Sequence, residues 1–277
     1  MISIGTPIHF GAILAAIMLA ACQASIPETG DLSAETVSVQ TVVDDAPDGE
    51  ALVSAYQNWK TSILNSSKAH SIKWREDKRL LWINANAEPE GFARDVALRV
   101  IHDQFPRNAS IWDPVEVSKI IEEIDPPITD EKLSFISRYL FQQMQTTDAE
   151  NAVWIEEQYA LNQGWFKISD YGTFASTNAW LLVQHAVHRP DFMAQVLDEM
   201  QRLYPDDEVR SQDYALLYDR VQMISEKPQR YGSQFTCQAG IMAVYSLEDP
   251  GALDALRASV QLGPFSEVAD GIVGQLC

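Results

Sequence analysis

Apolar side chains recur at intervals of three and four residues along most of the chain, which predicts amphipathic α-helices. One helix begins at Asp113-Pro114, an acidic cap followed by proline, and its apolar face includes Val117 and Ile120. The same periodicity predicts helices over residues 128–144, 149–161, 173–188, 190–203, 211–225 and 251–260. Two short apolar segments, 233–237 and 241–245, flank a predicted turn at 238–240. We therefore expect a mainly α-helical, single multi-helix domain with a small two-stranded β-hairpin near the C-terminus.

The first strongly apolar run, residues 10–21, is too short to cross a membrane but fits the apolar core of a secretory signal. It ends in Leu19-Ala20-Ala21-Cys22, the pattern that a lipoprotein signal peptidase cleaves. We expect lipidation of Cys22, and Gln23 after it favours the outer membrane, facing the periplasm. Because the first basic residue is Lys60, a plain signal peptide cleaved elsewhere stays open as the alternative.

Charge is distributed very unevenly. Residues 22–50 contain acids but no Lys or Arg, which predicts a disordered acidic tether. The whole chain has 39 acids against 20 bases, a net charge of −19, which excludes nucleic acid as a partner and leaves the lipid to hold the protein at a membrane. A hydrophobic fraction of 46% with seven tryptophans provides for a substantial core after residue 50.

A charged side chain interrupts the apolar face of the helix predicted over 211–225. Arg220 lies in the middle of that face, and Asp219 lies at its edge. A buried charge has to be paired or used. Arg220 is therefore either part of a structural ion pair or cap, or a clamp for a carboxylate or phosphate.

Polar residues share the opposite face of the helix predicted over 173–188. Gln184, His185 and His188 lie there, and His185 is a candidate general base or a hydrogen-bonded structural residue. His185 and His188 have a spacing compatible with a metal, but no further ligand stands at a recognisable distance in the sequence. We therefore expect no metal and no cofactor.

The segment 227–235 joins the Arg220 helix to the first predicted strand. It has neither the spacing of a phosphate-binding loop nor that of a nucleophile elbow. We expect Gln229, Tyr231 and Gln234 to hydrogen-bond the polar face around Gln184 and His185, directly or through a ligand.

These segments together resemble the uncharacterised bacterial domain of unknown function 6624. The likeness rests on residues 164–165, on 180–186 with its Leu-Val-Gln-His-Ala sequence, on Asp219-Arg220-Val221, and on 228–235, Pro-Gln-Arg-Tyr-Gly-Ser-Gln-Phe. Phe166 and Ser233 stand where family members usually have Pro and Thr. The resemblance covers roughly the last 120 residues and implies no known activity.

The resulting organisation is a signal peptide over 1–21, the tether over 22–50, an N-terminal helical region over 51–145, and a family-like helical domain with the hairpin over 146–277. If Cys22 is lipidated, Cys237 and Cys277 remain as a pair in an oxidising compartment. They are candidates for a disulfide, with free thiols as the alternative.

Two functional hypotheses follow. The first is a non-catalytic envelope module that binds a protein partner or a small anionic ligand through Arg220 and the Gln184 and His185 face. The second is a hydrolase or transferase acting on an anionic envelope metabolite, with His185 as general base, Asp219 as its orienting carboxylate and Arg220 as anion clamp.

Overall fold

The computed structural model describes residues 48–108 and 114–275. It confirms the predicted fold class, because the described chain is 68% helical, with ten α-helices and one two-stranded antiparallel sheet near the C-terminus. The predicted signal peptide, Cys22 and nearly all of the predicted tether lie outside the described residues. Among the helices described, none is long and apolar enough to cross a membrane. Tertiary contacts divide the chain into two compact units, and the boundary between them in the sequence lies between residues 189 and 190.

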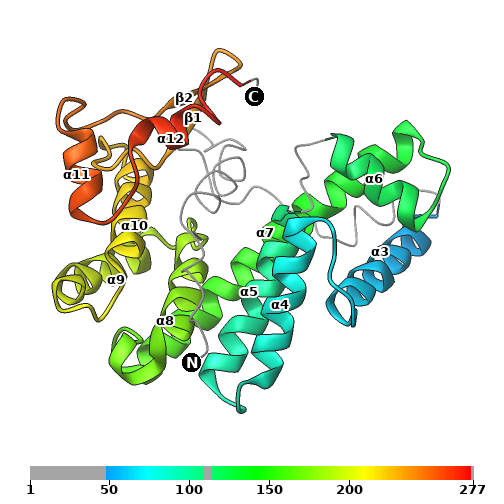
Figure 1. Ribbon diagram of the computed structural model, residues 1–277, viewed down its shortest axis with the longest axis horizontal. Coiled ribbons are helices and arrows are strands. Elements are labelled where there is room, and N and C mark those ends of the chain that lie inside the picture. Colours follow the sequence, from blue (N-terminus) through cyan, green and yellow to red (C-terminus); the bar gives the residue numbers. More distant parts are fainter. Residues whose placement is uncertain (1–47, 109–113, 276–277) are drawn as a thin grey trace, which may run out of the picture. The chain divides into compact units, whose positions relative to one another are not determined.

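The described residues of the first unit form six helices (Figure 1). They are α3 (Gly49–Leu64), α4 (Lys73–Ala87), α5 (Phe92–Asn108), α6 (Pro114–Ile124), α7 (Asp130–Asn162) and α8 (Ile168–Gln184). Helix α5 packs against α4, α7 and α8, so it is enclosed by three neighbours. At its C-terminal half, Phe105 is fully buried in edge-to-face contacts with Tyr56, Trp59 and Trp74. Because so many helices surround it, α5 is where polar side chains are most easily enclosed.

Two helix boundaries differ from those predicted. The segments 128–144 and 149–161 belong to one 33-residue helix, α7, although Thr146, Thr147 and Asp148 between them are poor helix formers. Packing of α7 against α5 and α8 outweighs that local preference. The domain boundary predicted at residue 145 consequently falls inside α7. Helix α8 is interrupted by the non-helical residue Gly172, so its main part begins at Thr173 as predicted, but it ends at Gln184, four residues before His188.

The second unit is smaller. It contains α9 (Pro190–Leu203), the 3-10 turn η2 (Tyr204–Asp206), α10 (Ser211–Ile224), β1 (Phe235–Gln238), β2 (Ile241–Val244), α11 (Leu253–Ser259) and α12 (Phe265–Ala269). The hairpin register pairs Gln238 with Ile241, and the two residues between them, Ala239 and Gly240, both have positive φ. Such a two-residue turn matches the twist of the strands. The helices and the hairpin predicted here are confirmed.

Cys237 lies on β1 and is disulfide-bonded. The other two cysteines, Cys22 and Cys277, lie outside the described residues. Main-chain hydrogen bonds join Gly274 and Gln275 to Met242, the residue that pairs with Cys237 across the hairpin. The last described residues therefore lie at the hairpin, and pairing of Cys237 with Cys277 stays a prediction.

Candidate functional site

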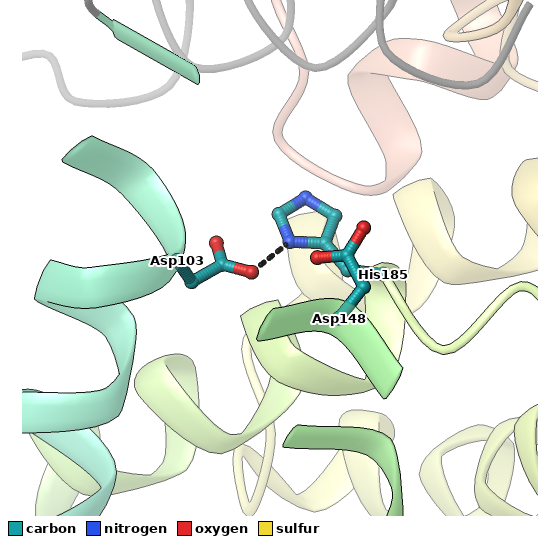
Figure 2. Close-up of side chains that lie close together, drawn as sticks. All are labelled: Asp103, Asp148 and His185. Atoms are coloured by element: carbon teal, nitrogen blue, oxygen red, sulfur yellow. Dashed lines mark hydrogen bonds and ion pairs between the residues drawn. The ribbon is translucent and has the colours of Figure 1, made fainter. Parts of the chain in front are cut away.

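Three ionisable side chains of the first unit meet between its helices (Figure 2). Asp103 comes from α5, Asp148 from α7, and His185 directly follows α8. One ligand atom from each lies within 4.8 Å of the others. Asp103 is fully buried and His185 is 2% exposed, whereas the Asp148 side chain is 17% exposed. The cluster is therefore enclosed, with Asp148 as its most accessible member.

The helix periodicity explains how these side chains come to point inward. Val96, Val100, Asp103 and Arg107 follow one another at intervals of three and four residues, so they share the buried face of α5. On α7, Asp148 lies one turn after the buried Met144 and one turn before the buried Ala152. A polar residue in a buried row has to find partners inside the protein.

Asp103 and His185 form a hydrogen-bonded dyad. The Nδ1 atom of His185 is 2.9 Å from Oδ1 of Asp103 (Figure 2). The second carboxylate oxygen of Asp103 accepts a 2.7 Å hydrogen bond from Nε2 of Gln104 and lies 3.5 Å from Nε of Arg107. An NH group of Arg107 also donates a hydrogen bond to Oδ1 of Asp148. One guanidinium thus bridges the two carboxylates.

The surroundings shift the pKa values of the two carboxyl groups in opposite directions. Burial by itself would raise the pKa of Asp103, but His185, Arg107 and Gln104 hold it well below its usual range. Burial raises the pKa of Asp148 to about 8, and the neighbouring Asp103 carboxylate adds to that effect while Arg107 opposes it. At neutral pH the site therefore holds an ionised and a protonated carboxyl group side by side, which is typical of acid and base pairs in enzymes.

We expect Asp148 to make stability depend on pH. Its pKa is about 8 in the folded protein and about 4 in the unfolded chain, so between these values the folded state binds more protons. The contribution of Asp148 to the free energy of unfolding is therefore fully present below about pH 4. It is lost as the pH rises toward 8, by up to about 1.4 kcal/mol per pH unit. Urea unfolding of the wild type and Asp148→Asn at pH 5.5, 7 and 8.5 measures this, since titrating groups outside the cluster contribute equally to both proteins. A wild-type advantage that grows with pH would contradict it.

The polar residues predicted to share one face of α8 are not all exposed to solvent. Gln184 and His185 are 1% and 2% exposed, because the end of α8 is enclosed on all sides, and only His188 is exposed. Since α8 ends at Gln184, His185 and His188 do not occupy one helical face. Neither amide atom of Gln184 has a hydrogen-bond partner within the described part of the chain. A buried amide without partners marks a position where a ligand or water binds.

Asp219 has a different environment, in the second unit. Its carboxylate accepts hydrogen bonds from the main-chain N–H groups of Arg230, Tyr231 and Ser233, at 2.8 to 3.2 Å. It is fully buried, and it fixes the loop between α10 and β1. The carboxylate that contacts His185 in the structure is Asp103, and the joint catalytic role of Asp219 and Arg220 stays a prediction.

The remaining predicted residues of the second unit are buried as well. Arg220 is 2% exposed, so its guanidinium does not extend into solvent. Gln229 donates to the carbonyl oxygens of Gln234 and Tyr245, and accepts from the N–H of Gln234. Gln234 also donates to the Ser233 hydroxyl. These contacts lie inside the second unit and are sufficient to define the loop conformation.

The chemistry of Asp103, Asp148 and His185 also suits a divalent cation, since two carboxylates and an imidazole are common ligands. However, Arg107 bridges both carboxylates and supplies positive charge at that position. A cation bound between them would have to displace this guanidinium. The arrangement consequently favours proton transfer over metal binding.

A family model described as "Family of unknown function (DUF6624)" matches residues 118–272, more than half of the chain. The chain belongs to this family. No curated protein and no solved structure matches it. In this family member Asp148 and His185 lie inside the matched residues, whereas Asp103 lies before them, on α5. The matched region alone therefore does not contain the complete dyad.

Sequence reasoning found His185 but missed Asp103 and Asp148. A usable signal was present for the first of these, because Asp103 interrupts an apolar row of α5 just as Arg220 interrupts that of α10. For Asp148 the sequence favoured a helix boundary, which concealed its place on a buried face.

Proposed function

We propose that this protein is an envelope hydrolase or transferase in which His185 is the general base, Asp103 orients it and Asp148 donates a proton. The observation that carries the proposal is the buried 2.9 Å hydrogen bond between His185 Nδ1 and Asp103. An ionised carboxylate accepts at Nδ1, which places the ring proton there and makes Nε2 the basic atom. This is the arrangement that activates water or a hydroxyl nucleophile.

The other groups supply complementary roles. The Nε2 atom of His185 takes the proton of the nucleophile, and the resulting imidazolium is stabilised by the Asp103 carboxylate. Asp148, kept protonated by burial, passes its proton to the leaving group. Since Asp148 is the most exposed of the three, the substrate approaches from its side. Gln184, the residue before His185, has a buried amide without a partner among the described residues and is a second candidate for binding the substrate.

We expect His185→Gln to abolish catalysis while the protein stays folded. Glutamine keeps a hydrogen-bonding group near Asp103 but cannot take up a proton at neutral pH, so the rate should fall by about 10²–10⁴-fold. Hydrolysis of p-nitrophenyl acetate and p-nitrophenyl phosphate, with circular dichroism of each variant, measures both properties. The matched control is His188→Gln, an exposed histidine three residues later, which should retain wild-type rates.

Two outcomes would contradict the proposal. If the wild type and His185→Gln turned over the probes equally, His185 would have no catalytic role. The alternative, a non-catalytic binding module, would then be favoured. Stoichiometric zinc, manganese or magnesium in the purified wild type, lost in Asp103→Asn, would make His185 a metal ligand instead of a base.

The location of this activity forms the second part of the proposal. Lipidation of Cys22, followed by the acidic tether, would hold the enzyme at the periplasmic face of the outer membrane. We expect cells to incorporate labelled palmitate into the wild type and not into Cys22→Ser. Labelling of both proteins, or of neither, would contradict the anchor without affecting the assignment of His185.

A further inference from the structure

A cavity of about 530 Å³ lies in the first unit, apart from the Asp103, Asp148 and His185 cluster. Side chains of α3, α5 and α7 line it, and none of the three cluster residues does. Its volume is in the range of pockets that bind small molecules. Its lining includes Tyr56, Lys60, Arg99, His102, Asn151 and Trp154.

Lys60 brings a cation to this cavity without a carboxylate partner. Its Nζ atom lies 3.1 Å from Nδ1 of His102 and 5.1 Å from the centre of the Phe105 ring. Within the described part of the chain it forms no ion pair. Burial lowers the Lys60 pKa to about 8, so the ammonium group is still mostly charged at neutral pH.

Arg99 is a second such cation. Its guanidinium lies 4.5 Å from the centre of the Trp154 ring, and one of its NH groups donates to Oδ1 of Asn151 at 3.0 Å. No carboxylate of the described residues forms an ion pair with it. Burial lowers the pKa of Arg99, and the nearby charges of Glu150, Asp95 and Glu157 oppose that shift. The two of these acids that line the cavity, Asp95 and Glu150, are exposed to solvent. Burial is the main cause that lowers the pKa of His102 to about 4, and the charges of Lys60 and Arg99 lower it further. Both cations therefore lie near that imidazole.

Asn151 supplies an independent indication of a ligand. It is 2% exposed, and its oxygen is used by Arg99, but its Nδ2 group has no acceptor among the described residues. A buried donor without an acceptor is costly unless a ligand or water satisfies it. The cavity thus combines two cations that form no ion pair within the described part of the chain and a buried amide donor that has no acceptor there.

We propose that this cavity binds the carboxylate or phosphate group of a small organic molecule between Lys60 and Arg99, with Asn151 Nδ2 donating to the same anion. Arginine and lysine are the usual ligands of such groups in proteins. The rings of Tyr56 and Trp154 form apolar walls for the rest of the molecule. The proposal is independent of the catalytic function proposed for His185.

Isothermal titration calorimetry of the full-length protein with benzoate, phenyl phosphate and inorganic phosphate tests this site. We expect millimolar or tighter binding of at least one organic anion, and at least tenfold weaker binding by Lys60→Gln and by Arg99→Gln. The matched control is Lys68→Gln, an exposed lysine in the loop after α3, which removes the same charge and should bind as the wild type does.

The conservative variants Lys60→Arg and Arg99→Lys keep the charge and should bind within a few-fold of the wild type, which separates loss of the anion contact from loss of folding. Preference for phenyl phosphate over inorganic phosphate would support an organic ligand. Three results would overturn the proposal: no binding of any probe at 10 mM, wild-type affinity in both glutamine variants, or binding of inorganic phosphate alone.

Discussion

Replacing Asp103 by asparagine should lower the free energy of unfolding by about 3–5 kcal/mol, the usual cost of removing one partner from a buried ion pair. Asparagine keeps the shape of the side chain but removes the charge that His185 and Arg107 share. Both groups are buried, at 2% and 6% exposure, so water cannot replace the lost carboxylate. Among the described residues, Asp148 is the carboxyl group that remains in the cluster.

Urea unfolding at pH 7, followed by circular dichroism, measures this difference. The control is Glu157→Gln, which neutralises an exposed acid on α7 and should change the free energy of unfolding by less than about 0.5 kcal/mol. An effect of Asp103→Asn as small as that of the control would mean that the cluster is not an ion-pair network. The proposed orientation of His185 would then lose its support.

Asp219→Ala should also destabilise the protein strongly, by at least about 3 kcal/mol. The substitution leaves the N–H groups of Arg230, Tyr231 and Ser233 without their acceptor, and each unsatisfied buried donor costs about 1–3 kcal/mol. These three N–H groups belong to one loop, so the losses are coupled and the loop itself is expected to rearrange. The same urea titration measures the loss.

The matched control for Asp219 is Asp198→Ala, an exposed position on α9, with an expected change within about 0.5 kcal/mol. Turnover of p-nitrophenyl acetate per folded molecule separates the two aspartates further. Because Asp219 contacts main chain and Asp103 contacts His185, folded Asp219→Ala should keep the wild-type rate. A stable Asp219→Ala protein without turnover would instead favour the catalytic role that the sequence first indicated.

Much of the fold could be predicted from local patterns. The helix after Asp113-Pro114, the helices α9 to α11 and the hairpin each have a capping signal, an apolar periodicity or a turn that is complete within some fifteen residues. Local patterns did not predict that the two segments 128–144 and 149–161 form the single helix α7. Thr146, Thr147 and Asp148 favour a helix end locally, and the packing of α7 against α5 and α8 overrides them.

The candidate site was predicted only in part for a related reason. His185 was identified by its residue type and its place near the end of a predicted helix. Its carboxylate partner is 82 residues earlier in the chain, and no spacing rule connects positions on different helices. The cavity is similar, since Lys60, Arg99 and Asn151 each look like ordinary helix residues until three helices bring them together.

By itself, the sequence determined the helical class of this protein, the position of its hairpin and its membership of the family, because each depends on residues close together along the chain. The tertiary structure decided which carboxylate contacts His185, why Asp219 is buried, and where two cations without an ion pair line a cavity. Those outcomes depend on which helix faces meet, and the free energy of that packing is shared by residues from the whole unit rather than by any one segment.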